Sequence, residues 1–301
     1  MSLLALLFAL ACERGLTHLL HLRELRWLDR YCDRAAQWVA GRSGAGLRGA
    51  AVVTVLLPAL PIAAVSWSLG SKLLGLPQFA FAVFLLLFSF GPRDLKDEVD
   101  DYVAALERGD RAAAASSARE LLEGDAQRRG LGAAAAIEDA IFVQANHRIF
   151  GVIFWFLVLG AAGAWLFRVS DLLRRRAAGE ARRVDQPVVG DSFGGALAQV
   201  HGILAWVPAR LAALSYALAG SFEDAVGNWR VAADGAGNGL AERSEDLLAR
   251  VGRGSLQPSI AAVPAAALDL ASARGAWRIV VRSLWIWLAI VAVLVLAGSA
   301  A

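Results

Sequence analysis

The sequence predicts an all-α, polytopic integral membrane protein, and two observations support this fold class. Hydrophobic residues make up 57% of the 301-residue chain and charged residues only 19%, whereas soluble domains are nearer about 45–50% apolar. The apolar residues also gather in long blocks, and a membrane-crossing helix needs roughly 20 of them. No strand pattern is evident between these blocks. The expected surroundings of the chain are therefore a lipid bilayer.

Composition also excludes several other classes of protein. The chain is too apolar for intrinsic disorder, and its two cysteines are too few for a disulfide framework. A net charge of +3 is too small for a nucleic-acid-binding protein, so no nucleic acid is expected as a partner.

Two parts of the chain are predicted to cross the membrane outright. Residues 47–90 form a transmembrane hairpin with arms at 47–69 and 73–90. Residues 279–301 form a C-terminal transmembrane helix, of which 279–297 is the apolar span. Six arginines precede the hairpin, and the excess of basic residues in cytoplasmic segments places that end of the chain in the cytoplasm.

A fourth apolar segment, 149–168, has two interpretations. Its centre carries Gly160-Ala-Ala-Gly163, which suits either a spanning helix with a small-residue face or a re-entrant segment buried by protein. A full span would export the arginines that follow, against the positive-inside rule: Arg168, Arg174, Arg175, Arg176, Arg182 and Arg183. The charge pattern favours a re-entrant segment and leaves a transmembrane one open.

The remaining segments are predicted to form helices that face the cytoplasm. Residues 1–46 read as an apolar and then amphipathic N-terminal helix without a cleaved signal, 91–148 as a soluble helical segment, and 169–278 as amphipathic and soluble helices. Within 91–148, Gly109-Asp110 is expected to end one helix and cap the next, which predicts two antiparallel helices. Pro208 is expected to kink or restart a helix. The acid-rich start of the soluble segment is interpreted as a solvated helix face rather than a cation or partner site: Asp94, Asp97, Glu98, Asp100 and Asp101.

The residues alone indicate no cofactor and no metal site. A phosphate-binding GxxxxGK[ST] loop is missing, and His18 and His21 lack a clear third ligand; His147 and His201 are interpreted as interfacial imidazoles. Glu13 follows an apolar stretch, where a carboxylate suggests function. A further polar set could line a cytoplasm-facing pocket, and structural ion pairing explains it equally well: Glu138, Asp139, Asn146, Arg148 and Arg210.

Three runs of sequence resemble a known family: FGPRDLKDEVDDYVAALERGD, FVQANHRIFGVIFWFLVLGAAGAWLFRVSDLL and WVPARLAALSYALAGSFEDAVGNWR. They look like the AmpE family of bacterial inner-membrane proteins, associated with the regulation of β-lactamase induction and cell-wall recycling. That family in turn resembles the CobD/CbiB family, membrane enzymes that attach an aminopropanol arm to the corrin ring of cobalamin. The run FGGALAQVHGILAWVPARL and the turn at 160–168 carry this second resemblance.

The chain departs from the corrin-modifying family at several polar positions. Where that family carries acidic or amide side chains, this sequence has Ala145, His201, Gly202 and Ala205. Four matching residues join Glu13 in the tentative ligand-binding set: Asn146, Arg168, Asp171 and Arg210.

The resemblance and these departures together imply a function. The resemblance to AmpE implies a non-enzymatic signalling or sensor protein of the multi-pass inner membrane, with a small-molecule or protein partner from cell-wall recycling. The alternative is a membrane-bound ligase or synthase that acts on a small phosphorylated substrate. A transporter is disfavoured, since the spans hold few charges and show no inverted repeat.

Overall fold

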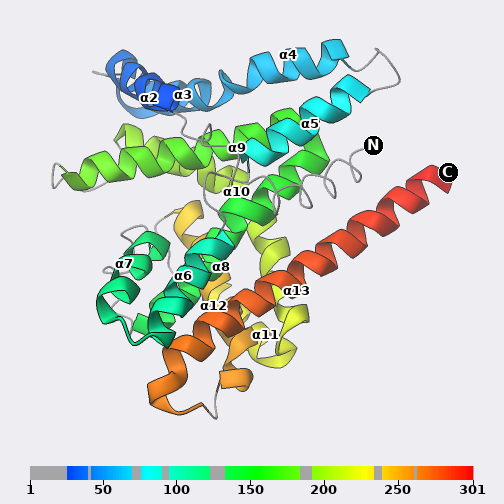
Figure 1. Ribbon diagram of the computed structural model, residues 1–301. Helices are drawn as coiled ribbons and strands as arrows, with labels where there is room; N and C mark the ends of the chain where they lie inside the picture. Colours follow the sequence, from blue (N-terminus) through cyan, green and yellow to red (C-terminus); the bar gives the residue numbers. More distant parts are fainter. Residues whose placement is uncertain are drawn as a thin grey trace. The chain divides into compact units, whose positions relative to one another are not determined.

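The computed structural model describes residues 26–39, 42–69, 76–89, 95–122, 133–183, 192–233, 239–260 and 263–300, and every element in them is a helix (Figure 1). Four of these helical stretches are long and apolar enough to cross a membrane: Gly44–Leu69, Ala134–Gly179, Phe193–Ala219 and Ala267–Leu294. The prediction of an all-α polytopic membrane protein is therefore confirmed.

The chain divides into two compact units. The first comprises residues 1–92, 151–206 and 239–241, and the second comprises residues 93–150, 207–238 and 242–301.

The first unit is built around the long helix α9 (Gly151–Arg183). Four helices contact it: α2 (Arg26–Val39), α3 (Gly44–Leu56), α4 (Ala59–Leu69) and α5 (Leu76–Ser89). Figure 1 shows α5 lying along α9. A buried apolar cluster joins these helices to the start of α10 (Phe193–Ala219), and Val55, Leu85, Trp165 and Leu197 belong to it. Burial of apolar side chains is thus what holds α9 in place.

Of the hairpin arm predicted over 73–90, the described residues of α5 are Leu76–Ser89; these 14 residues extend about 21 Å at 1.5 Å per residue. Helix α10 is a correction to the prediction, because its 27 residues make it a candidate span within the region predicted as amphipathic and soluble. Arg210 and His201 lower its apolar character in sequence.

Helix α9 is broken at Gly160. The Gly160 backbone has φ 66° and ψ −153°, a conformation that residues other than glycine rarely adopt. The break brings the Trp155 backbone so close to Gly163 that a Cβ there would overlap the Trp155 carbonyl oxygen and lie 2.6 Å from Leu159 Cβ. Both glycines are therefore required by the geometry, and the choice between a re-entrant and a spanning segment stays a prediction.

Pro58, in the turn between α3 and α4, and Pro208, inside α10, each leave a carbonyl four residues earlier without a helical donor, and an aromatic side chain supplies the donor in both places. Pro58 lies four residues after Thr54, and the Tyr31 hydroxyl donates to the Thr54 carbonyl at 2.7 Å. Pro208 lies four residues after Leu204, and Trp155 Nε1 donates to the Leu204 carbonyl at 3.0 Å. Because a proline has no N–H, these donors replace the missing bonds. Helix α10 consequently continues through Pro208 rather than restarting there.

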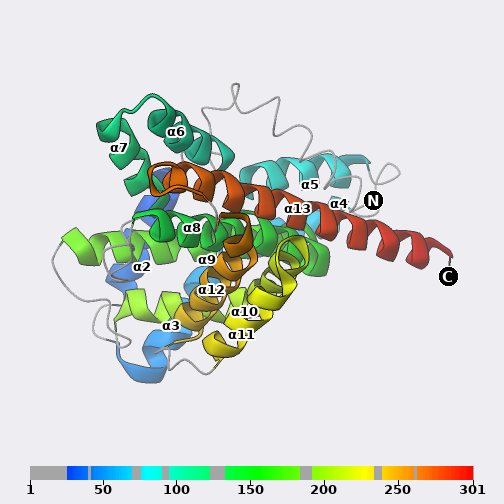
Figure 2. The ribbon, with the colours of Figure 1, turned by 90° about the horizontal axis from the view of Figure 1, so that it is seen from below.

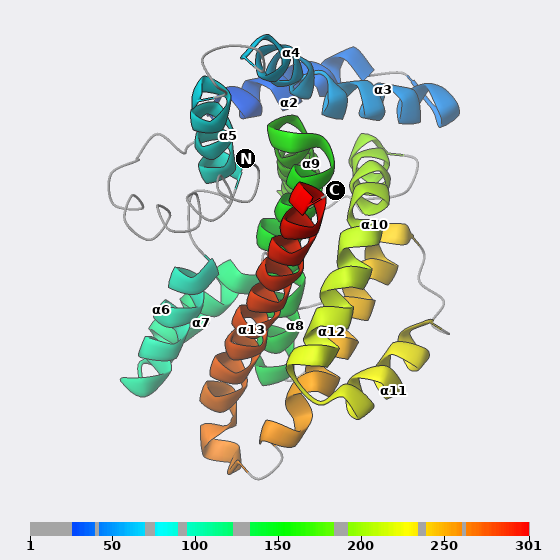
Figure 3. The same ribbon diagram turned by 90° about the vertical axis from the view of Figure 1, so that its right-hand side faces the viewer.

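The second unit contains the helical hairpin predicted from Gly109-Asp110. Helices α6 (Leu95–Glu107) and α7 (Arg111–Leu122) lie side by side in Figure 3. Gly109 has φ 70°, and Asp110 Oδ1 accepts hydrogen bonds from the backbone N–H groups of Ala112 and Ala113 at 3.1 and 3.0 Å. Asp110 is therefore an N-cap, as the sequence predicted.

The rest of this unit packs on α8 (Ala133–Ala145), which runs into a π-helical turn, η4 (Asn146–Phe150). Helix α13 (Ala265–Ala300) contacts both α8 and α6 (Figure 2). The unit also contains α11 (Phe222–Ala233) and α12 (Leu240–Ile260) from Glu242 onward. The buried Tyr216 ring lies 4.9 Å from Phe142, whose carbonyl accepts from the Tyr216 hydroxyl at 2.9 Å. Aromatic packing with a satisfied hydroxyl thus fixes the centre of the unit.

Tyr102 on α6 is a second buried tyrosine of this unit. Its burial, and next the negative charge of Asp269, raise the pKa of the Tyr102 phenol above its ordinary value. Both causes favour the neutral side chain.

Candidate functional site

A fully buried carboxylate, Asp171 on α9, is the centre of the first polar cluster. Three guanidinium groups of the same helix surround it. Arg168 lies 3.3 Å, Arg174 3.1 Å and Arg175 2.8 Å from the Asp171 oxygens. Their positions, at −3, +3 and +4 relative to Asp171, place all of them on one helix face. A buried carboxylate is stable when its charge is compensated in this way.

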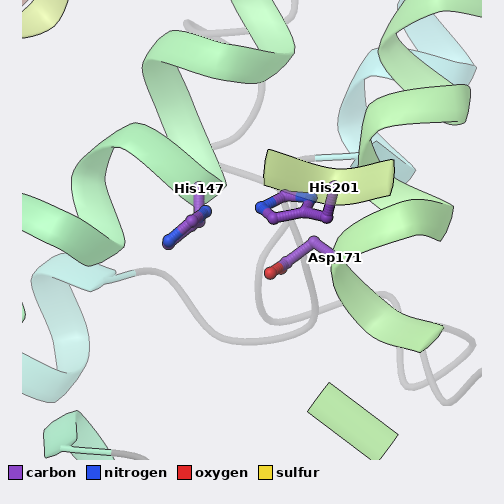
Figure 4. Close-up of side chains that lie close together, drawn as sticks. All are labelled: His147, Asp171 and His201. Atoms are coloured by element: carbon purple, nitrogen blue, oxygen red, sulfur yellow. The ribbon is translucent and has the colours of Figure 1, made fainter. Parts of the chain in front are cut away.

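Ser170 and His201 form a fully buried pair beside this carboxylate. The Ser170 hydroxyl donates to the Phe167 carbonyl at 2.7 Å and lies 2.9 Å from His201 Nδ1. The Phe167 ring is 5.1 Å from the His201 ring, measured between centroids. Figure 4 shows His201 and Asp171 beside each other. A ring nitrogen of His201 lies within 4.8 Å of a carboxylate oxygen of Asp171. An imidazole next to a carboxylate is a common arrangement for proton transfer.

The arginine cluster reaches the surface of the first unit. The side chains of Arg174 and Arg175 are 18% and 19% exposed, and Arg176 pairs with Asp33 of α2 at 2.9 Å. Guanidinium groups that are fixed by a carboxylate and partly open to solvent suit a carboxylate or phosphate ligand, because their planar N–H groups bind such anions in pairs.

The second unit holds a separate polar cluster in the π-helical turn η4. Asn146, His147 and Arg148 are consecutive and all buried. His147 Nε2 lies 3.3 Å from Glu245 Oε1, and Arg148 donates to Glu98 Oε1 at 2.7 Å. Single π-helical turns occur often at functional sites because they redirect consecutive side chains.

Asn146 differs from its neighbours because its side chain is unsatisfied. Among the described residues, neither its amide nitrogen nor its amide oxygen has a hydrogen-bond partner. Burial of an unpaired amide costs free energy, and proteins retain such groups where they serve a ligand or a strained site. Asn146 is therefore the residue of this cluster that is best suited to contact a ligand.

The acidic start of α6 corrects one sequence interpretation. Asp97, Asp100 and Asp101 are exposed, and Asp100 pairs with Lys96, as a solvated face requires. Glu98 is instead buried in its ion pair with Arg148. The partner lies 50 positions away, so local sequence could not reveal it.

Structural ion pairing also accounts for part of the predicted pocket lining. Glu138 and Asp139 on α8 are both buried, and Arg253 lies 2.9 Å from Asp139. Arg210, on α10, is half-buried in the same unit.

The tentative ligand-binding residues therefore fall into separate groups. Arg168 and Asp171 lie together in the first unit, as an ion pair. Asn146 and Arg210 both belong to the second unit, where the unsatisfied Asn146 amide excludes a hydrogen bond between them. Glu13 lies outside the described residues.

Sequence reasoning missed several members of the first cluster. Arg174 and Arg175 entered only as a topology signal, although their spacing from Asp171 could have identified them. His201 was treated as an interfacial imidazole, and no local signal joins it to Ser170, 31 positions away.

The fold and the two buried polar clusters define a polytopic helical membrane protein that has polar residues suited to ligand binding. The chain belongs to the CobD/CbiB family, because the family model described as CobD/Cbib protein matches residues 6–242. A similar protein is the cobalamin biosynthesis protein CobD of Stutzerimonas stutzeri, 32% identical over 209 residues, which are 68% of this chain and 65% of that protein. Another is the cobalamin biosynthesis protein CobD of Chromobacterium violaceum, 32% identical over 188 residues, 62% of this chain and 57% of that protein.

The chain spans less than two thirds of the length of these two curated relatives. No solved structure matches the chain.

These matches correct the sequence-based view of function. A non-enzymatic signalling role in β-lactamase regulation is wrong, because the relatives are named for cobalamin biosynthesis. The predicted CobD/CbiB-like scaffold is confirmed, whereas the assignment to the AmpE family is not shown by these matches.

Proposed function

We propose that this chain is a membrane-bound synthase of cobalamin biosynthesis in the bacterial inner membrane. The observation that carries the proposal is the family match over residues 6–242, which includes both polar clusters described above except the Glu245 end of the second. The names of the two CobD relatives support the same pathway. The finer assignment to the AmpE family stays a prediction from the three resembling runs.

The reaction class that the resemblance implies is the condensation of an aminopropanol amine with a corrin carboxyl group: the C–N bond of the amide forms, a carboxyl C–O bond breaks, and the oxygen leaves as water. Both a corrin carboxylate and a phosphorylated amine carry negative charge. Arg174 and Arg175 are partly exposed and are held by Asp171, so they suit binding of such a group. His201, beside Asp171, suits the acceptance of a proton from the amine as the bond forms.

Two departures from the family pattern have an explanation in the fold. Gly202 lies where a Cβ would be 2.6 Å from the backbone nitrogen of Ala241, so α10 can approach the start of α12 only with glycine here. Ala205 is buried with 2% exposure, so it packs rather than binds. We therefore assign anion binding to the arginine cluster around Asp171 and not to this stretch of α10.

Complementation tests this function. A bacterium that lacks its own CobD and depends on cobalamin for growth would receive this chain. The expected result is restored growth and a corrin product that carries the aminopropanol arm, detected by mass spectrometry. Asp171→Asn should lower product formation at least about tenfold, because the arginines lose the charge that positions them. Asp101→Asn, an exposed control, should not change it.

The proposal fails if the chain accumulates in the membrane in amounts comparable to the native CobD and still forms no arm-bearing corrin. Equal product formation by the Asp171→Asn and Asp101→Asn proteins would remove the arginine cluster from the site while leaving the synthase assignment intact.

A further inference from the structure

Helix α2 carries a stripe of basic and aromatic side chains that the proposed synthase reaction does not use. Arg30, Arg34 and Trp38 are spaced four residues apart, so they lie on one face of the helix. All three are exposed. Cys32, Ala35 and Val39 are buried on the opposite face, against the first unit. The helix is therefore amphipathic, with its apolar face already occupied.

Arg42 extends this stripe beyond the end of the helix. Its guanidinium carbon lies 4.0 Å from the centroid of the Trp38 ring, a cation–π geometry. The Trp38 side chain is nonetheless 52% exposed. An exposed indole next to a cation is the combination that membrane proteins place at the level of lipid headgroups. Arg30, Arg34, Trp38 and Arg42 are named the α2 basic stripe below.

The arginines of the α2 basic stripe have no carboxylate partner among the residues that the structure describes. Asp33, on the same helix, is paired with Arg176 at 2.9 Å. Arg48, exposed in the next helix, adds a fourth positive charge nearby. The stripe thus presents an excess of positive charge that attracts an anionic surface.

The position of the α2 basic stripe in the chain indicates which kind of anion it meets. The candidate span Gly44–Leu69 begins two residues after Arg42. The short connection keeps Arg42 and Trp38 near the edge of the hydrocarbon, where phospholipid headgroups are the nearest anions.

We propose that the α2 basic stripe binds the headgroups of anionic phospholipids. Arginine guanidinium groups bind headgroup phosphates in pairs, and the Trp38 ring contributes apolar area at the headgroup level. Such a contact holds α2, and through Asp33–Arg176 the arginine-rich end of α9, at the membrane surface. This inference does not rest on the synthase function.

Native mass spectrometry of the detergent-purified full chain tests the proposal. Phosphatidylglycerol is titrated as the anionic lipid and phosphatidylcholine as the zwitterionic one. The triple variant Arg30→Gln, Arg34→Gln, Arg42→Gln should bind phosphatidylglycerol on the order of 100-fold more weakly, because each arginine near an anionic surface contributes about fivefold in affinity. Phosphatidylcholine binding should stay within about twofold.

A matched control keeps the same change in net charge. Arg108, Arg111 and Arg230 are exposed in the second unit, and their triple replacement by glutamine should leave phosphatidylglycerol binding within about twofold. If the stripe triple variant does not fold, Arg34→Gln alone should lower the affinity about fivefold.

Three results would overturn the proposal. The first is unchanged phosphatidylglycerol binding by the stripe variant. The second is an equal loss in the control variant, which would show a non-specific charge effect. The third is complete displacement of phosphatidylglycerol by millimolar inorganic phosphate, which would show a site for a soluble anion instead of a lipid headgroup.

Discussion

The hydrogen bond from Trp155 to the Leu204 carbonyl can be tested by a double-mutant cycle with Pro208. Trp155→Phe removes the indole N–H and keeps an aromatic ring. It leaves the Leu204 carbonyl without a donor, because Pro208 cannot supply one. Leaving such a group unsatisfied costs about 1–3 kcal/mol.

Pro208→Ala should reduce the cost of removing the indole N–H, because alanine at this position supplies a backbone N–H four residues after Leu204. The carbonyl then has its helical donor, and its two lone pairs can accept the indole as well. In this background Trp155→Phe should cost only the lost packing. The two substitutions should therefore show a coupling free energy of roughly 2 kcal/mol, since the packing contribution cancels in the cycle.

The four proteins would be unfolded by added denaturant in detergent micelles and followed by circular dichroism. Trp285→Phe serves as a control because this tryptophan is exposed, so its replacement should change the free energy of unfolding by less than about 0.5 kcal/mol. Tyr31→Phe with Pro58→Ala repeats the cycle at the Thr54 carbonyl. A coupling below about 0.5 kcal/mol in both cycles would refute the explanation of how the prolines are accommodated.

Three further outcomes follow from the buried polar groups. Asn146→Leu should leave the free energy of unfolding unchanged or raise it by about 1 kcal/mol, because it removes an unsatisfied buried amide. Product formation in the complementation assay should nevertheless fall. A loss of stability would instead show that Asn146 has a structural role. Glu98→Gln leaves the buried Arg148 without its counter-charge and should lower the free energy of unfolding by about 3–5 kcal/mol. The control Asp97→Asn, at an exposed position, should lower it by less than about 0.5 kcal/mol. Similar losses for the two variants in denaturant titrations would contradict the burial of Glu98. Stability should fall as the pH rises above about 10, because burial and Asp269 raise the pKa of Tyr102 and the unfolded chain loses that proton first. Tyr102→Phe should flatten this part of the profile, and an unchanged slope would contradict it.

Local pattern was sufficient to predict much of the fold. The Gly109-Asp110 break and the cap at Asp110 depend on residues within one turn of one another, and the apolar arm predicted over 47–69 is a continuous run that lies within the candidate span Gly44–Leu69. Helix α10 shows where this reasoning ends. Its polar residues and Pro208 lowered its apolar character in sequence, because the buried environment that accommodates them is supplied by distant residues such as Trp155.

The candidate site divides in the same way. Arg168 was predicted, and its ion pair with Asp171 follows helical spacing, as do those of the missed Arg174 and Arg175. The pairing of Glu98 with Arg148 depends on tertiary packing, which sequence spacing does not encode. The function could not be predicted from local sequence pattern either. Gly202 and Ala205 stand where the related family has polar residues, which suggested that catalysis was lost. In the structure both positions serve helix packing.

Ser170 ties His201 to the backbone of α9. Its hydroxyl donates to the Phe167 carbonyl and lies 2.9 Å from His201 Nδ1, so the imidazole of one helix is held through a single turn of another. Because both side chains are fully buried, a change of Ser170 would alter the orientation of the ring beside Asp171 without changing any charge.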